Sequence, residues 1–282
     1  EKENIRLYFE DVKKVNTWFG RHVSIRGRAP FTDHVEQGFI DKEGFNPRQS
    51  TKAYLDFRFK DSKLKAIVVS QWGNYGLPPA QSSFIIHCAV VQHYFAGGYY
   101  PLGGSHKIFE SIETALGENG GMCLTSHQVN EILVENGRAV GVRAQALREA
   151  GEPVKEFFAD KIISDAGAYN TYQKLLAGQK VDFRDQLEKF YQKHPVVSNV
   201  TLYLGLKDDP RSLGFGGENH WIYPGYDHDS NFKGGYNWVE KGEVVGAYLS
   251  FPSLKNAETK AHTAEIIAFT DYTFFERWKE QP

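Results

Sequence analysis

The stretch that most constrains the fold of this chain begins at residue 97, where a glycine-rich turn leads directly into an amphipathic helix. Residues 97–105 read GGYYPLGGS, with two tyrosines and a proline among four glycines. Ser105 is a good N-cap, because its hydroxyl can accept from the free N–H groups of a first helical turn. The following apolar residues share one helical face, and the glycines at 117–121 predict its end. We expect residues 122–125 to form a short strand after it.

The same stretch continues with a β-hairpin and a further strand. Asn136-Gly137 is the strongest short hairpin signal a sequence offers, and residues 129–134 and 139–142 flank it. The next apolar run is expected to be a strand that ends at Asp165. In an open α/β sheet, ligands bind beyond the carboxyl ends of the strands. The order of turn, helix, hairpin and strand therefore predicts part of a dinucleotide-binding domain.

Motifs throughout residues 100–176 match one family in order. They are Tyr100-Pro101-Leu102-Gly103-Gly104, Gly120-Gly121, Val129 with Ile132, Gly141-Val142, Ile162-Ile163-Ser164-Asp165-Ala166-Gly167, Asn170-Thr171-Tyr172 and Leu175-Leu176. In this order they resemble the FAD-dependent family of phytoene desaturases, carotenoid isomerases and retinol saturases. The last two motifs extend the likeness toward the retinol saturases.

The resemblance implies a set of cofactor contacts. The glycine-rich turn would lie beside the isoalloxazine ring of FAD, with Gly103 and Gly104 as contacts and with Tyr99 and Tyr100 close to the flavin and the substrate. The backbone of Val129 would meet the adenine. The backbones of Ala166 and Gly167 would face the cofactor at the end of a strand. No catalytic residue is identified.

One family element is missing from the sequence. The family begins with a strand, a G-x-G-x-x-G turn and a helix, where glycines and a helix N-terminus hold the pyrophosphate. The chain contains no such turn with a following apolar helix. We therefore interpret the 282 residues as an internal fragment of a longer enzyme, which alone would be inactive and would bind FAD poorly or not at all.

The predicted fold class is α/β, or α+β when the chain is taken overall. It would be a partial FAD/NAD(P)-binding flavoprotein fold with a discontinuous substrate domain. Residues 1–104 would form the first part of the substrate domain and the glycine-rich turn, with helical and extended signals that include a strand at 66–69 and a buried helix at 83–91. Residues 105–168 would be the middle part of the FAD domain. Residues 169–282 would return to the substrate domain as a helix at 183–193, a final helix at 261–278, and an antiparallel sheet from strands at 196–206, 219–223 and 243–251.

Composition excludes several classes of protein. The chain has 33 basic and 35 acidic residues and a net charge of −2, which gives no electrostatic case for a nucleic-acid partner. Cys88 and Cys123 are its two cysteines, which fits a reducing compartment better than a disulfide scaffold. We expect a cytoplasmic protein, and the resemblance implies a lipophilic small-molecule substrate. Peripheral contact with a membrane and the oligomeric state stay open.

Three side-chain clusters have competing interpretations. The first contains His87, Cys88 and His93, whose spacing is not that of a structural zinc site. The second contains His220 and residues 227–229, but residues 224–229 are better explained as a solvated hairpin loop. We expect no metal. The third cluster is an aromatic series that would form either a polyene tunnel or ordinary core: Trp221, Tyr223, Tyr226, Phe232, Tyr236 and Trp238.

The resemblance implies an FAD-dependent oxidoreductase that desaturates, saturates or isomerises a carotenoid- or retinoid-like polyene. The flavin would exchange hydride with a substrate carbon, while the protein would supply orientation and a dry apolar channel. That channel is expected to run along the substrate-domain sheet to residues 97–105. Two alternatives remain: a flavin amine oxidase-like enzyme, and a non-catalytic lipid-binding module that has lost its dinucleotide site.

Overall fold

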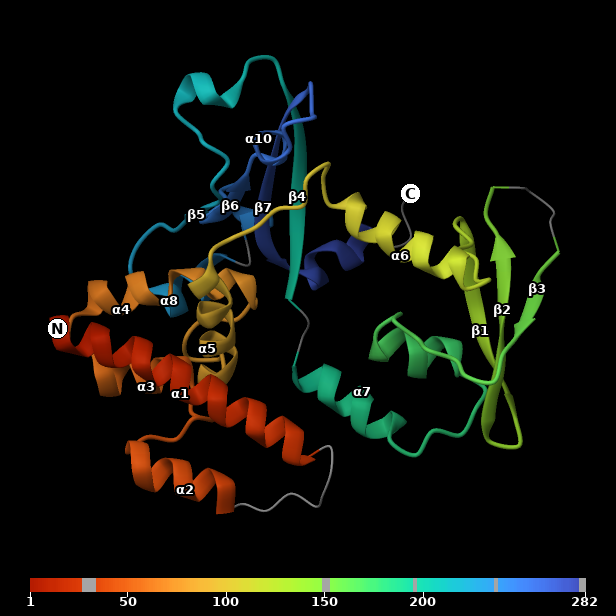
Figure 1. Ribbon diagram of the computed structural model, residues 1–282, viewed down its shortest axis with the longest axis horizontal. Coiled ribbons are helices and arrows are strands. Elements are labelled where there is room, and N and C mark those ends of the chain that lie inside the picture. The colour runs from red at the N-terminus through yellow and green to blue at the C-terminus, as the bar shows by residue number, and fades with distance from the viewer. Residues whose placement is uncertain (27–33, 149–152, 195–196, 236–237, 279–282) are drawn as a thin grey trace. The chain divides into compact units, whose positions relative to one another are not determined.

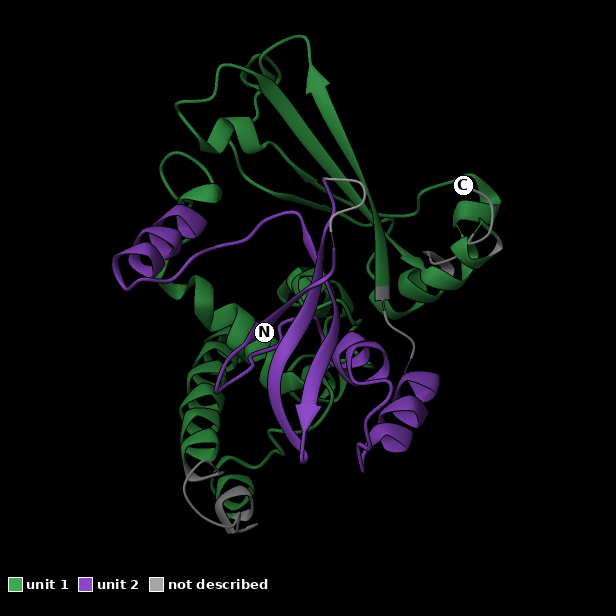
Figure 2. Ribbon diagram, turned by 90° about the vertical axis from the view of Figure 1, so that its right-hand side faces the viewer, with its two compact units in different colours: residues 1–107, 197–282 green, residues 108–196 purple. Residues whose placement is uncertain are grey.

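The computed structural model of the chain describes residues 1–26, 34–148, 153–194, 197–235 and 238–278, and it divides them into two compact units. Unit 1 contains residues 1–107 and 197–282, and unit 2 contains residues 108–196 (Figure 2). Each unit has helices and its own antiparallel sheet, so the α+β class and the sheet of the discontinuous part are confirmed. The exact domain limits given above, with a return at residue 169, remain a prediction.

The first part of unit 1 is helical throughout (Figure 1). Its elements are α1 (Lys2–Arg26), α2 (His34–Glu43), α3 (Thr51–Arg58), α4 (Ser62–Val68), η1 (Ser70–Asn74), α5 (Phe84–His93) and η2 (Tyr94–Ala96). The buried helix predicted at 83–91 is therefore confirmed, and the strand predicted at 66–69 is wrong. That segment belongs mostly to α4, which Asp61 caps: its carboxylate accepts from the Leu64 N–H at 2.9 Å. A good N-cap outweighed the β propensity of a short apolar run.

The core of unit 1 forms where α1 packs against α5. Tyr8, Val12 and Val15 are spaced four and three residues apart on one face of α1, and all three are buried. Tyr54 of α3 stacks on Phe84 of α5 with ring centroids 3.7 Å apart. Trp72 of η1 belongs to the same cluster, and Phe269 of the sheet packs against it. The helices and the sheet of unit 1 thus share one hydrophobic core.

The sheet of unit 1 has four antiparallel strands in the order β4-β7-β6-β5. They are β4 (Val197–Leu206), β5 (His220–Ile222), β6 (Ala247–Ser250) and β7 (His262–Asp271). The three predicted strands are confirmed as β4, β5 and a shortened β6. The final helix predicted for residues 261–278 is wrong, because residues 262–271 form β7 and only η5 (Tyr272–Trp278) after them is helical, of the 3-10 type.

The pattern of burial explains the strand β7. Ala264, Ala268 and Thr270 are its buried residues, and their even spacing places all three on one face of the sheet. The segment also contains four β-branched residues, which fit a pleated surface better than a helix: Thr263, Ile266, Ile267 and Thr270.

Four short helical elements connect the strands: η4 (Pro210–Leu213), α8 (His228–Gly235), α9 (Trp238–Lys241) and α10 (Pro252–Lys255). The interpretation of residues 224–229 as a solvated hairpin loop is wrong at its end: residues 224–227 are exposed and irregular, but α8 begins at His228. Asp227 caps α8, since its carboxylate accepts from the Ser230 N–H at 3.0 Å. His228 is buried, and its Nε2 donates to the Ala66 carbonyl at 3.0 Å.

Unit 2 contains the predicted hairpin together with an additional strand. Its elements are α6 (His106–Glu118, which begins in unit 1), β1 (His127–Glu135), β2 (Arg138–Ala146), β3 (Lys155–Phe158), the π-helix η3 (Asn170–Leu175) and α7 (Arg184–Lys193). Asn136 and Gly137 have φ angles of 51° and 77°, which a two-residue type I′ hairpin requires. The helices predicted after Ser105 and at 183–193 are confirmed as α6 and α7. β3, which pairs antiparallel with β2, had not been expected.

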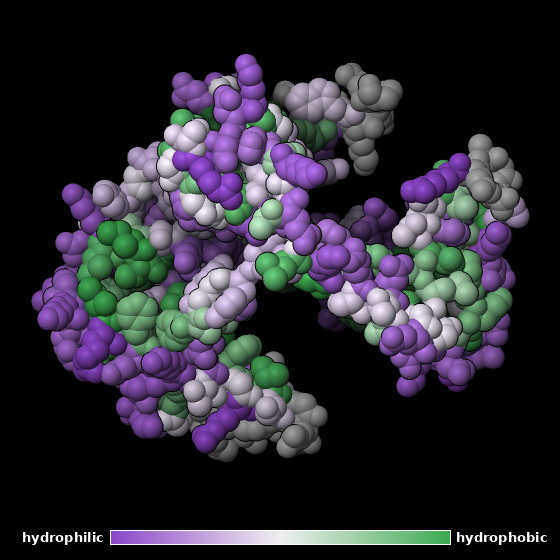
Figure 3. All heavy atoms as spheres, turned by 45° about the horizontal axis from the view of Figure 1, so that its top comes forward, coloured by the Kyte–Doolittle hydropathy of each residue, from purple (hydrophilic) through white to green (hydrophobic). Residues whose placement is uncertain are grey.

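Two predicted strands of unit 2 are irregular in the structure. Residues 122–125 and 162–165 have no strand assignment, and Ile163 is 95% exposed. A strand needs a neighbour for its backbone N–H and C=O groups, and in the described part of unit 2 no strand pairs with either segment. The apolar face of α6 is also exposed, with Ile112 at 62%. Figure 3 shows hydrophobic and hydrophilic residues interspersed on the visible surface.

Candidate functional site

The glycine-rich turn of residues 97–105 follows η2 and leads into α6. Gly103 and Gly104 have φ angles of 85° and 101°, which side-chain-bearing residues rarely adopt. Tyr99 is 87% exposed, yet its hydroxyl donates to the Ala96 carbonyl at 2.7 Å. The turn is therefore exposed at Gly98 and Tyr99, whose hydroxyl is anchored to the backbone, whereas the predicted contacts Gly103 and Gly104 are buried.

The donors around this turn fit a ligand with negative charge or many carbonyl groups. A Cβ atom built on Gly98 would meet nothing within 4 Å, so the backbone there is accessible. The α6 helix starts directly after the turn without an acidic residue in its first turn. Lys107 lies against the turn, since a Cβ on Gly103 would come within 2.7 Å of its Cε atom. Helix N-termini and ammonium groups favour anions, so these residues fit the polar edge of a flavin.

Lys255 is a residue at this site that sequence reasoning missed. Its Nζ atom lies 6.0 Å from the centroid of the Tyr100 ring and donates to Ser250 Oγ at 2.7 Å and to Asn219 Oδ1. Partial burial lowers the pKa of the Lys255 ammonium group, since burial disfavours its charged form. No sequence signal connects these four residues, because only the sheet and α10 bring them together.

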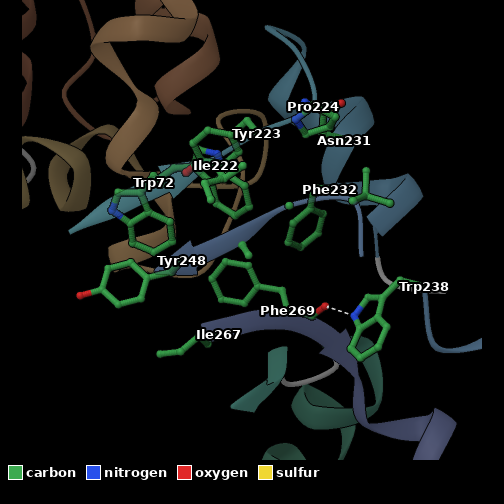
Figure 4. Close-up of a pocket in the computed structure, with 14 residues that line it drawn as sticks. Trp72, Ile222, Tyr223, Pro224, Asn231, Phe232, Trp238, Tyr248, Ile267 and Phe269 are labelled. Carbon is green, nitrogen blue, oxygen red and sulfur yellow. Dashed lines mark hydrogen bonds between the residues drawn. The ribbon is translucent and has the colours of Figure 1, made fainter. Parts of the chain in front are cut away.

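An aromatic pocket lies at the sheet of unit 1, with a cavity of about 50 Å³. Figure 4 shows Trp72, Tyr223, Phe232, Tyr248 and Phe269 around it. The indole N–H of Trp238 donates to the Phe269 carbonyl at 2.8 Å, which fixes the orientation of the Trp238 ring. The core interpretation is confirmed for Tyr223 and Phe232, which pack against the helical core. The polyene tunnel stays a prediction.

A second pocket, which we call the helix-side pocket, lies between β5 and the helices α4 and η1. Its cavity measures about 450 Å³, and its lining includes Ala66, Ile67, Ser70, Tyr226 and His228. Burial lowers the pKa of His228, which keeps its ring neutral near pH 7.

The remaining predictions about these pockets have mixed outcomes. Tyr236 of the aromatic series lies outside the described residues. Neither pocket is lined by a residue of the turn at 97–105, so the channel expected between sheet and turn stays a prediction.

In unit 2 one of the predicted contacts, Gly167, lines a cavity. A cavity of about 800 Å³ is lined by Asp165 and Gly167 together with hairpin residues such as Ile132. The carbonyls of Ala166 and Gly167 already accept from the Asn170 side chain and the Thr171 N–H. Val129 does not line this cavity; it lies on β1 opposite Ala144 and is 40% exposed. A role for these residues toward a cofactor stays a prediction.

Arg184 shapes the edge of the unit 2 cavity. Its guanidinium donates to three main-chain carbonyls at the end of η3: those of Tyr172 at 3.0 Å, Ala177 at 3.1 Å and Leu176. Replacing Arg184 with Ala should speed amide exchange of residues 170–177 by about 30-fold, since charged hydrogen bonds worth about 2 kcal/mol are lost. Hydrogen-exchange mass spectrometry measures this. The control is Lys189→Ala on exposed α7 surface, and equal exchange in both variants would contradict the prediction.

The side chains considered for a metal site have structural roles. His87 is buried, with Nε2 2.7 Å from the Tyr8 hydroxyl and Nδ1 3.1 Å from the Tyr75 hydroxyl. Burial lowers the pKa of His87 to about 4 and raises that of the neighbouring Cys88 thiol. Within the described ranges, no group of three or more His, Cys, Asp or Glu side chains is placed to hold a metal ion.

Comparison with known proteins finds distant relatives of this chain. No protein-family model matches the chain. The all-trans-retinol 13,14-reductase of Danio rerio is 26% identical over 230 residues, which cover 78% of this chain and 37% of that protein. The chloroplastic prolycopene isomerase of Arabidopsis thaliana is 25% identical over 227 residues, covering 79% of this chain and 35% of that protein. The chain is therefore similar to retinol saturases and carotenoid isomerases, which supports the family resemblance of its motifs.

A solved structure shares the fold of this chain. An oxidoreductase from Methanosarcina mazei superimposes with a TM-score of 0.55 at 15% identity, covering 90% of this chain and 55% of that one. The chain spans well under half the length of the two curated relatives. Among its described helices, none combines the length and the apolar character that crossing a membrane requires.

Proposed function

We propose that the protein to which this chain belongs is an FAD-dependent oxidoreductase that acts on a carotenoid- or retinoid-like polyene. The observation that carries the proposal is the lining of the two unit 1 pockets, which contains aromatic and aliphatic side chains and, among the described residues, no Lys, Arg, Asp or Glu. A polyene gains affinity from apolar surface removed from water and offers almost nothing to hydrogen-bond. The names of the relatives, a retinol reductase and a prolycopene isomerase, support the same substrate class.

The residues proposed to hold FAD are Gly103 and Gly104 at the turn and Val129, Ala166 and Gly167 in unit 2. When bound, the flavin supplies hydride transfer. The chain's own residues orient the ring and exclude water from it. Tyr99 and Tyr100 present aromatic surface at the turn, and the ammonium group of Lys255 is held beside Tyr100 by Ser250 and Asn219. We propose a cytoplasmic location; membrane contact and oligomeric state stay open.

The two alternatives differ from this proposal in their chemistry. A flavin amine oxidase would need a fixed charged partner for its substrate, and neither pocket supplies one. A non-catalytic lipid-binding module would bind the polyene and leave it unchanged. The pocket lining therefore argues against the amine oxidase and is compatible with the lipid-binding module.

The test uses the full-length protein reconstituted with FAD. We expect anaerobic bleaching of the flavin near 450 nm by a carotenoid or retinoid in detergent, or conversion of the polyene after the flavin is reduced with dithionite. A panel of amines, offered in parallel, should not bleach it. Bleaching by amines alone would contradict the proposal, and polyene binding without bleaching or conversion under either condition would favour the lipid-binding module.

A further inference from the structure

The aromatic pocket and the helix-side pocket share one wall. Trp221, Tyr223 and Pro224 line both cavities, so these residues separate a space of about 50 Å³ from one of about 450 Å³. Trp221 and Tyr223 are two residues apart near the end of the sheet, and their rings are nearly parallel, at 9°, with centroids 6.4 Å apart. A change in either ring would alter the boundary between the pockets.

Tyr223 is the fixed part of this wall. Its hydroxyl donates to the Ser70 carbonyl at 2.6 Å, which ties the ring to η1. The ring also meets the buried His228 edge to face, with centroids 4.5 Å apart. Moving Tyr223 would break a hydrogen bond and disturb the buried side of α8.

Trp221 is the movable part. Its indole makes no hydrogen bond to a described residue, whereas the indole of Trp238 in the same pocket donates to the Phe269 carbonyl. Ring contacts alone hold it, including Tyr248 at 4.7 Å. The ring lies so close to Gly73 that a Cβ atom there would come within 2.1 Å of it. The closed position of Trp221 therefore depends on glycine at residue 73.

We propose that Trp221 is a gate between the two pockets and that a long apolar ligand binds in the single cavity formed when its indole moves aside. The helix-side pocket already has a volume usual for small-ligand sites, and displacing the indole would extend it into the aromatic pocket. The neutral, aromatic lining selects an uncharged conjugated hydrocarbon chain. This inference rests on the proposed function, because it names the place where the polyene would bind.

The gate is tested with the 282-residue chain, which already contains both pockets. The long probe is all-trans-retinol, titrated by its own fluorescence, and the short probe is β-ionone, titrated by competition with retinol. Trp221→Ala removes the indole that a long ligand must displace, so its retinol affinity should rise about tenfold, the equivalent of one or two lost aromatic contacts. Affinity for β-ionone, which fits the helix-side pocket alone, should change less than threefold.

Three further variants complete the test. Trp221→Phe should show an intermediate gain and decides the outcome if the alanine variant fails to fold. Gly73→Ala should also strengthen retinol binding, because its methyl group displaces the indole. Tyr203→Ala, a change at an exposed residue of β4, should leave both affinities unchanged.

Two results would overturn the gate. One is an equal gain in affinity for retinol and for β-ionone. The other is a retinol affinity that the Trp221 and Gly73 variants leave unchanged, and absence of retinol binding in all variants counts as this result. If the full-length protein still converts polyenes, only the gate is lost. If retinol binds as expected but the full-length protein converts no polyene, the gate stands and the proposed function fails.

Discussion

Replacing Arg58 with Met is expected to lower the free energy of unfolding of unit 1 by about 3–5 kcal/mol. Arg58 Nη2 donates to Asp11 Oδ2 at 2.5 Å, and the Tyr54 hydroxyl donates to the same oxygen at 2.6 Å. The Asp11 side chain is only 3% exposed, so removing the guanidinium leaves a buried carboxylate without its main counter-charge. Lys14 compensates weakly, because its Nζ atom is 3.7 Å from the other oxygen and partly in solvent.

Urea unfolding followed by tryptophan fluorescence measures this loss. All five tryptophans of the chain lie in unit 1, so the signal reports on this unit alone. Arg6→Met is the matched control: Arg6 pairs with Glu3 on the exposed surface of α1, where such a pair is worth at most about 1 kcal/mol. Adding Asp11→Asn to Arg58→Met should recover part of the stability, since it removes the buried charge. Equal losses for Arg58→Met and Arg6→Met would show that the ion pair contributes little.

His87 should make unit 1 less stable as the pH falls. Its pKa is about 4 in the folded chain, against an ordinary value near 6.5, because burial disfavours the charged ring. Between pH 6.5 and 4 the unfolded chain therefore binds a proton that the folded chain does not. The resulting destabilisation is absent above pH 6.5 and grows to about 3 kcal/mol as the pH falls to 4.

The contribution of His87 can be separated from those of other titrating groups. Gln at residue 87 does not titrate and can still hydrogen-bond Tyr8 and Tyr75. The free energy of unfolding of His87→Gln should therefore depend less on pH than that of the unchanged chain, by about 3 kcal/mol between pH 7 and 4. His93→Gln changes an exposed histidine on the same helix and should keep the original slope. If the free energy of unfolding of His87→Gln also keeps the original dependence on pH, His87 is not a buried neutral group.

Local signals in the sequence determined the elements whose stability is local. The hairpin at Asn136-Gly137 is specified by two residues that accept positive φ angles. The end of α6 follows from its glycines, with Gly121 N–H donating to the Leu116 carbonyl at 2.9 Å. The glycine-rich turn at 97–105 could likewise be found from composition alone. In each case the information lies within a few neighbouring residues.

Tertiary structure decided the features that depend on distant partners. Residues 262–271 become a strand because β4 and β6 lie on either side to accept their hydrogen bonds, and residues 162–165 stay irregular where no strand pairs with them. The Lys255 site and the wall formed by Trp221 against Gly73 join residues far apart in the chain. A strand or a pocket is stabilised by groups that folding brings together, so the sequence of one segment cannot specify it.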